Sequence, residues 1–92
     1  MSQTAAELRI RGMVQGVGFR WFARERARAN GVSGWVRNNS DGTVSAYAEG
    51  DETAVRLFVE ELRAGPRSGE VSDVDIEWSD FTGKYSTFDI KH

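Results

Sequence analysis

The stretch Gly12-Met13-Val14-Gln15-Gly16-Val17-Gly18-Phe19-Arg20 joins two segments whose apolar residues repeat with different periods. Before it, Ala6–Met13 alternates between apolar and charged side chains, and this period of two predicts a half-buried strand. From Phe19 onward, apolar residues recur at three- and four-residue spacing, which predicts a helix that ends at Gly31. A strand that passes directly into a helix is the opening of a β-α-β unit.

Two further strands follow the first helix. We expect them at Ser33–Asn38 and Thr43–Glu49, because apolar residues alternate in both segments. The four residues 39–42 between them include Asp41-Gly42, a pair that readily takes the positive φ angles of a tight hairpin turn. The two strands are therefore expected to be antiparallel neighbours.

The second half of the chain repeats the change of period. A helix is expected to begin at Asp51, since acidic residues suit a helix N-terminus, and to end at Gly65. Residues 74–78 alternate again and predict another strand, and Phe88 and Ile90 predict a short last one. The order β-α-β-β-α-β plus a C-terminal strand predicts an α+β fold of the ferredoxin-like, split β-α-β kind. Two helices would cover one face of a mainly antiparallel sheet.

Composition limits what such a chain can be. With 92 residues, of which 39% are hydrophobic, residues 1–92 are expected to form a single globular domain. Disulfides, thiolate metal sites and iron–sulfur clusters are excluded because there is no cysteine. No signal peptide is apparent, and no segment approaches the ~18–20 apolar residues of a membrane span. We therefore expect a cytoplasmic protein without membrane contact.

Charge is distributed unevenly along the chain. Residues 1–40 hold seven arginines against two glutamates, whereas residues 41–92 hold five basic against twelve acidic residues, for a net charge of −2. An acidic chain with one basic half favours a local anion site over a nucleic-acid-binding stripe.

The segment Gln15–Phe19 has the features of that anion site. Gly16 and Gly18 allow unusual backbone angles, so successive N–H groups at a helix N-terminus can converge on an anion. Arg20 adds a guanidinium whose planar fork matches phosphate oxygens. A cation in the first turn opposes the helix dipole, so its presence there suggests function. The two glycines alone would equally suit an ordinary turn, and the motif is neither a P-loop nor a dinucleotide fingerprint.

A second candidate residue, Asn38, ends the strand that follows the helix. The two strands of a β-α-β unit are parallel, so their C-terminal ends share one edge of the sheet. If a third strand lies between them, Asn38 and the anion loop are ~10 Å apart, which is two strand spacings. A phosphate and one water fit that gap. The alternative is that Asn38 is simply a turn residue.

The two motifs together, residues 12–20 and Gly34-Trp35-Val36-Arg37-Asn38 with Asp41-Gly42-Thr43-Val44, resemble the acylphosphatase family over nearly the whole chain. The resemblance implies metal-free, cofactor-free hydrolysis of the carboxyl–phosphate bond of small acyl phosphates, with inorganic phosphate as product and inhibitor. It implies Arg20 and Asn38 as catalytic residues, with Asn38 orienting water. We expect a monomer. The residues implied to bind phosphate are Gln15, Gly16, Val17, Gly18, Phe19 and Arg20.

This chemistry makes small demands on the protein. An acyl phosphate expels a carboxylate, whose conjugate acid has a pKa of ~4–5, so no strong general acid is needed. The remaining tasks are to hold the phosphoryl group, balance its charge and aim a water in line. An asparagine amide can hydrogen-bond that water but cannot act as a base.

Two other functions compete with hydrolysis. One is a non-catalytic anion- or RNA-binding module of the same fold, although acidic residues such as Asp73 and Asp75 would repel phosphate from the sheet face. The other is a domain of a larger carbamoyl-transfer enzyme. His92, at the end of the chain, is expected to have no catalytic or metal-binding role. Packing in the core or on the sheet is expected for Phe19, Phe22, Trp35, Tyr47 and Trp78.

Overall fold

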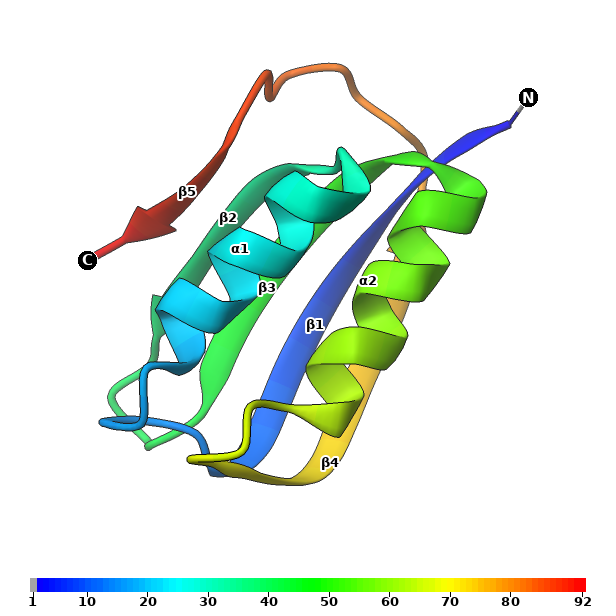
Figure 1. Ribbon diagram of the computed structural model, residues 1–92. Coiled ribbons are helices and arrows are strands. Elements are labelled where there is room, and N and C mark those ends of the chain that lie inside the picture. The colour runs from blue at the N-terminus through cyan, green and yellow to red at the C-terminus, as the bar shows by residue number, and fades with distance from the viewer. Residues whose placement is uncertain (1) are drawn as a thin grey trace.

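The computed structural model describes residues 2–92 as two layers, with a pair of helices on one face of a five-stranded sheet (Figure 1). The strand order is β4-β1-β3-β2-β5, and only the β2–β5 pair is parallel. This is the predicted ferredoxin-like arrangement with its short extra strand. The elements are β1 (Gln3–Met13), α1 (Phe19–Asn30), β2 (Ser33–Asn38), β3 (Val44–Asp51), α2 (Glu52–Ala64), β4 (Glu70–Ser79) and β5 (Phe88–Lys91).

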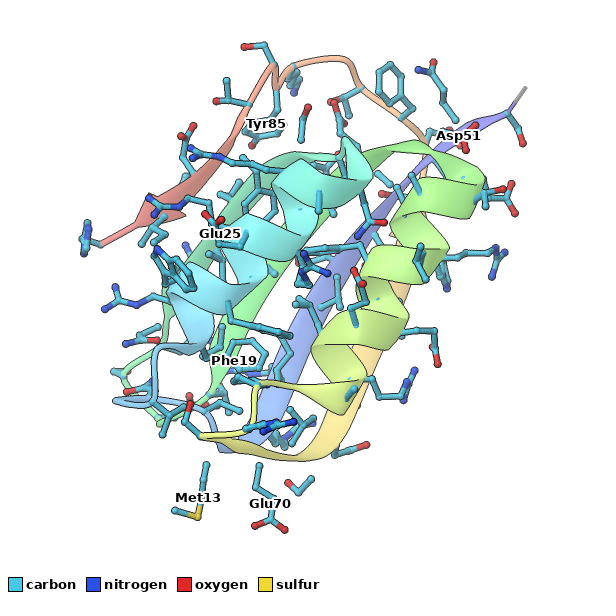
Figure 2. All side chains as sticks on the ribbon, viewed as in Figure 1. Met13, Phe19, Glu25, Asp51, Glu70 and Tyr85 are labelled. Carbon is cyan, nitrogen blue, oxygen red and sulfur yellow. The ribbon has the colours of Figure 1, made fainter. Side chains whose placement is uncertain are left out.

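The core lies between the helices and the sheet. Burial alternates over residues 6–10 in β1 and residues 44–48 in β3, as predicted, and the helices contribute the apolar stripes found in the sequence. Figure 2 shows the Phe19 side chain directed between the helical layer and the sheet, and it is 1% exposed. Its ring and that of Phe58 are among the largest buried groups, so they contribute much of the apolar burial. The helical residues that are buried are Phe19, Ala23, Ala27, Val55, Phe58, Val59 and Leu62.

Strand β3 lies between β1 and β2 and pairs antiparallel with both. Therefore β1 and β2 are parallel, two strand spacings apart, and both end at the same edge, as expected. The register places Ile10 opposite Val44 and Val44 opposite Asn38. Residues in one such row point to the same face of a sheet, and Ile10 and Val44 are buried under the helices. Asn38 thus lies on the helix side of the sheet, where the loop after β1 begins α1.

The sequence reading was wrong in a few details. Strand β1 begins at Gln3 rather than Ala6, and its register with β4 shifts after Arg11, so Gly12 is exposed instead of continuing the apolar row. Trp78 packs on the sheet as expected but less completely than a core residue: it is 40% exposed on edge strand β4, where the Arg56 guanidinium of α2 lies over its ring at 4.7 Å from the centroid.

A buried carboxylate, Glu49, fastens the segment between β4 and β5 across the sheet. Its Oε1 accepts hydrogen bonds from the Tyr47 hydroxyl (2.8 Å) and from the Thr82 hydroxyl (2.7 Å) and backbone N–H (3.1 Å). The Tyr47 ring contacts that of Tyr85, with centroids 5.3 Å apart, and Tyr85 is labelled on this segment in Figure 2. Burial by itself raises the pKa of Glu49, but the hydrogen bonds outweigh it and the pKa is lowered.

The lowered pKa makes stability depend on pH. A carboxylate whose pKa is lower in the folded than in the unfolded chain stabilises the fold above the ordinary value of 4.5. That contribution is lost as the pH falls through the folded-state pKa. We expect Glu49→Gln to lower the free energy of unfolding at pH 7 by about 1–3 kcal/mol. It should also flatten the dependence of that free energy on pH below 4.5, measured by urea denaturation.

The exposed carboxylate of Glu77 on β4 provides the control. Glu77→Gln should leave the unfolding free energy nearly unchanged both at pH 7 and below pH 4.5. An equal effect of the two substitutions would show that the Glu49 hydrogen bonds do not hold this segment.

Candidate active site

The loop between β1 and α1 takes its shape from two glycines in the left-handed region. Gly16 has φ 74° and Gly18 has φ 76°. Gly18 is the N-cap of α1; it offers no side-chain oxygen to the first turn, and that turn contains no acidic residue. The first helical N–H groups are therefore left without a capping side chain, at the positive end of the helix dipole. This is the arrangement that binds anions at helix N-termini.

Gln15 fastens this loop to the β2–β3 hairpin. Its side-chain amide nitrogen donates to the carbonyl oxygens of Asn39 (2.8 Å) and Thr43 (2.9 Å). Both acceptors belong to the turn that directly follows Asn38. The Gln15 amide thus fixes the distance between the anion loop and the end of β2.

A third loop supports the other side of the anion loop. The Ser68 hydroxyl, between α2 and β4, donates to the Val17 carbonyl at 2.7 Å. Figure 1 shows the three connections, β1–α1, β2–β3 and α2–β4, gathered at one end of the sheet. Met13 and Glu70, at the same end, project away from the ribbon in Figure 2. The anion loop is therefore held from two directions although it lies at the surface.

Arg20 lies in the first turn of α1 and is partly buried. Its Nη1 is 3.3 Å from Nδ1 of His92, and within residues 2–92 no carboxylate forms an ion pair with it. A guanidinium without a carboxylate partner keeps its charge available for an anionic ligand.

Asn38 is exposed, and its side chain makes no hydrogen bond within the described residues. The neighbouring Asn39 provides the turn contacts instead: its amide donates to the hydroxyls of Thr43 (2.9 Å) and Ser45 (2.7 Å). The turn thus needs no contribution from the Asn38 amide, which argues against the alternative that Asn38 is only a turn residue.

A pocket of about 200 Å³ brings these groups together. Of the residues expected at the site, Gly16, Gly18, Phe19, Arg20 and Asn38 line it, whereas Gln15 and Val17 do not. Phe19 contributes mainly backbone, since its ring is in the core. Arg20 is the pocket's one permanently charged side chain, and no carboxylate lines it. The remaining lining residues are Val14, Trp21, Ile90 and His92.

Sequence reasoning did not place His92 at the pocket, although the expectation that it has no catalytic or metal-binding role is a separate prediction, and it left the role of Trp21 undecided. The signal for His92 was the alternation that had already indicated the last strand: Phe88, Ile90 and His92 are spaced by two. Val36 of β2 pairs with Ile90 and faces the helices, so the residues two positions further on, Asn38 and His92, are directed to that same side. What the sequence did not reveal is that β5 pairs with β2.

A larger cavity, about 280 Å³, lies on the opposite, open face of the sheet. Its lining includes the carboxylates of Glu7, Asp75 and Glu77, and its Arg11 forms ion pairs with Asp73 and Asp75. The acidic surface expected on β4 is therefore present, and it repels anions. The smaller pocket is the better anion site because its charge is unopposed.

Two structural findings limit other classes of site. Among residues 2–92, no group of three or more His, Asp or Glu side chains is placed to hold a metal ion. None of the helices in this range is both long and apolar enough to cross a membrane.

Comparison with known proteins shows which family the fold and sequence match. The acylphosphatase family model matches residues 6–90. An acylphosphatase from Pelotomaculum thermopropionicum is 47% identical over 98% of both chains. The crystal structure of acylphosphatase from Bacillus subtilis has a TM-score of 0.93 and 35% identity, covering 97% of this chain and 99% of that one. HypF of T. kodakarensis is also similar (TM-score 0.84, 27% identity), but the match covers only 12% of that chain.

The geometry predicts how inorganic phosphate affects stability. A ligand that binds only the folded state raises the melting temperature by mass action. We expect phosphate to raise the melting temperature of the unmodified protein, and Arg20→Gln to abolish most of that rise, as measured by thermal denaturation. Arg67→Gln, a change of an exposed arginine on the α2–β4 loop, is the control and should preserve it. Full phosphate stabilisation in Arg20→Gln would place the anion site elsewhere.

Proposed function

The chain belongs to the acylphosphatase family and is an acylphosphatase enzyme, and we propose that its active site is the pocket between the N-terminus of α1 and the end of β2. The observation that carries this assignment is the lining of that pocket. It combines one unpaired guanidinium, uncapped helical N–H groups and a free asparagine amide, with no carboxylate among them. These groups suit a phosphoryl group and an attacking water.

In the proposed mechanism, the backbone N–H groups of residues 15–20 and the Arg20 guanidinium hold the phosphoryl oxygens. Donors already fixed in place need no reorganisation as charge develops in the transition state. The bond between the phosphorus and the acyl oxygen breaks, and the leaving carboxylate is stable enough to depart without a general acid. The protein thus contributes mainly position and charge, without a metal ion or cofactor.

Asn38 orients the attacking water in this mechanism. Strand β3 lies between β1 and β2. The anion loop follows β1 and Asn38 ends β2, so the two reach the pocket from opposite sides. The Gln15 amide keeps these two sides at a fixed separation. An asparagine can accept a hydrogen bond from the water and donate one to a phosphoryl oxygen, which fixes an in-line approach.

The proposal extends to how the protein acts in the cell. Residues 1–92 form one domain that works as a monomer in the cytoplasm, on small acyl phosphates, and inorganic phosphate is both product and competitive inhibitor. The chemical basis is the small size of this pocket, about 200 Å³, which admits a phosphoryl group with a compact acyl chain. Neither nucleic acid nor a membrane takes part.

The test of this function is hydrolysis of benzoyl phosphate in the presence and absence of EDTA. We expect equal rates in both and negligible hydrolysis of an alkyl phosphate, because an alkoxide leaving group needs a general acid, which neither Arg20 nor Asn38 can supply. Activity that disappears in EDTA and returns with a divalent ion would contradict the metal-free mechanism. Similar rates on both substrates would contradict the role of the leaving group.

Substitution of Asn38 separates catalysis from binding. Asn38→Ala should lower kcat by about 10²–10³-fold, because it removes an interaction made mainly in the transition state. Phosphate affinity and the melting temperature should change little, since the amide makes no hydrogen bond within the described fold. Asn39→Ala is the contrasting variant: it removes the turn contacts and should lower stability by about 1 kcal/mol. A folded Asn38→Ala protein with normal kcat would refute the water-orienting role.

A further inference from the structure

The imidazole of His92 contacts Arg20, and His92 lines the same pocket as Asn38, the other proposed catalytic residue. Its Nδ1 is 3.3 Å from Nη1 of Arg20. The parallel register of β5 with β2 pairs Arg37 with Lys91, so His92 follows beside Asn38. All three residues line the same pocket. The Arg20–His92 contact involves no other residue of the anion loop.

The chemistry of the Arg20–His92 contact determines which way the hydrogen bond runs. A guanidinium has five N–H donors and no acceptor, so Nδ1 must accept. Nδ1 therefore carries no proton, and the neutral ring carries its proton on Nε2. One Arg20 donor is used in this bond, which leaves four for an anion in the pocket.

We propose that His92 is a positioning residue, whose neutral imidazole holds the Arg20 guanidinium in the orientation that binds the phosphoryl group. An arginine side chain otherwise loses much rotamer freedom when it engages a ligand. A guanidinium held in advance loses less, so the contact increases affinity for the substrate. This inference rests on the proposed function of the pocket and adds a residue to it.

Only the neutral ring can fill this role. A doubly protonated ring has no acceptor at Nδ1, and its positive charge would face that of Arg20. No Asp or Glu side chain lines the pocket. The other charged side chains nearby are Arg24, one turn further along α1, and Asp89 and Lys91 on β5, which alternation directs to the open face, where Lys91 contacts Trp35.

Three variants test the proposal. His92→Asn keeps an oxygen acceptor where Nδ1 lies, and His92→Leu removes the acceptor. Lys91→Ala is the matched control, because it alters the same end of β5 on the opposite face. For each we would measure kcat and KM for benzoyl phosphate, and the rise in melting temperature with inorganic phosphate, at pH 8.

At pH 8, His92→Asn and Lys91→Ala should match the unmodified protein. His92→Leu should have a KM about three- to tenfold higher, the effect of losing one hydrogen bond to a charged group, with a smaller change in kcat. Its phosphate-induced rise in melting temperature should be smaller.

Two results would overturn the proposal. One is an unchanged KM in His92→Leu, and the other is an equal rise of KM in His92→Asn and His92→Leu. Failure of the proposed function is a separate result: the unmodified protein would not hydrolyse benzoyl phosphate, yet the phosphate-dependent melting temperatures would still report on Arg20 positioning.

Discussion

The backbone hydrogen bonds of β3 with β1 on one side and β2 on the other are the constraint on which the site depends. Two strands that are each antiparallel to a third must be parallel to each other. Their C-terminal ends therefore meet at one edge, two strand spacings apart. The anion loop leaves one end and Asn38 occupies the other, so sheet pairing alone sets the scale of the pocket.

Small residues let the helical layer pack closely on the sheet, and let β2 and β3 lie close together within it. Ala46 and Ala48 of β3 are fully buried, as is Ala23 of α1. At Gly34, which has φ 148°, an added Cβ would overlap the Tyr47 carbonyl oxygen across the strand pair. A larger residue there would separate β2 from β3 and move Asn38. Close packing in the middle of the sheet thus helps to keep Asn38 in position at the edge where the pocket lies.

Polar side chains then fix the parts of the site that apolar packing cannot reach. Loops at a sheet edge lie in water, where burial contributes little to their order. The amide of Gln15, the hydroxyl of Ser68 and the imidazole of His92 each tie one part of the pocket to a segment distant in sequence. A first-turn arginine opposes the helix dipole, a local cost that burial of the core offsets.

The sequence by itself determined the order and kind of the elements. Apolar residues repeat every two positions in a strand and every 3.6 in a helix that buries one face, and both patterns can be seen in consecutive residues. It also predicted an anion loop from Gly16, Gly18 and Arg20, since φ preference and charge belong to single residues. Only the tertiary structure showed that His92 contacts Arg20 and that Gln15 bonds to the β2–β3 hairpin. It also showed the hydrogen bond between Glu49 and Thr82 and the exposure of Trp78 on an edge strand. Those contacts join residues 24 to 72 positions apart, or depend on which strand is at the edge, and strand order follows from how the whole chain packs.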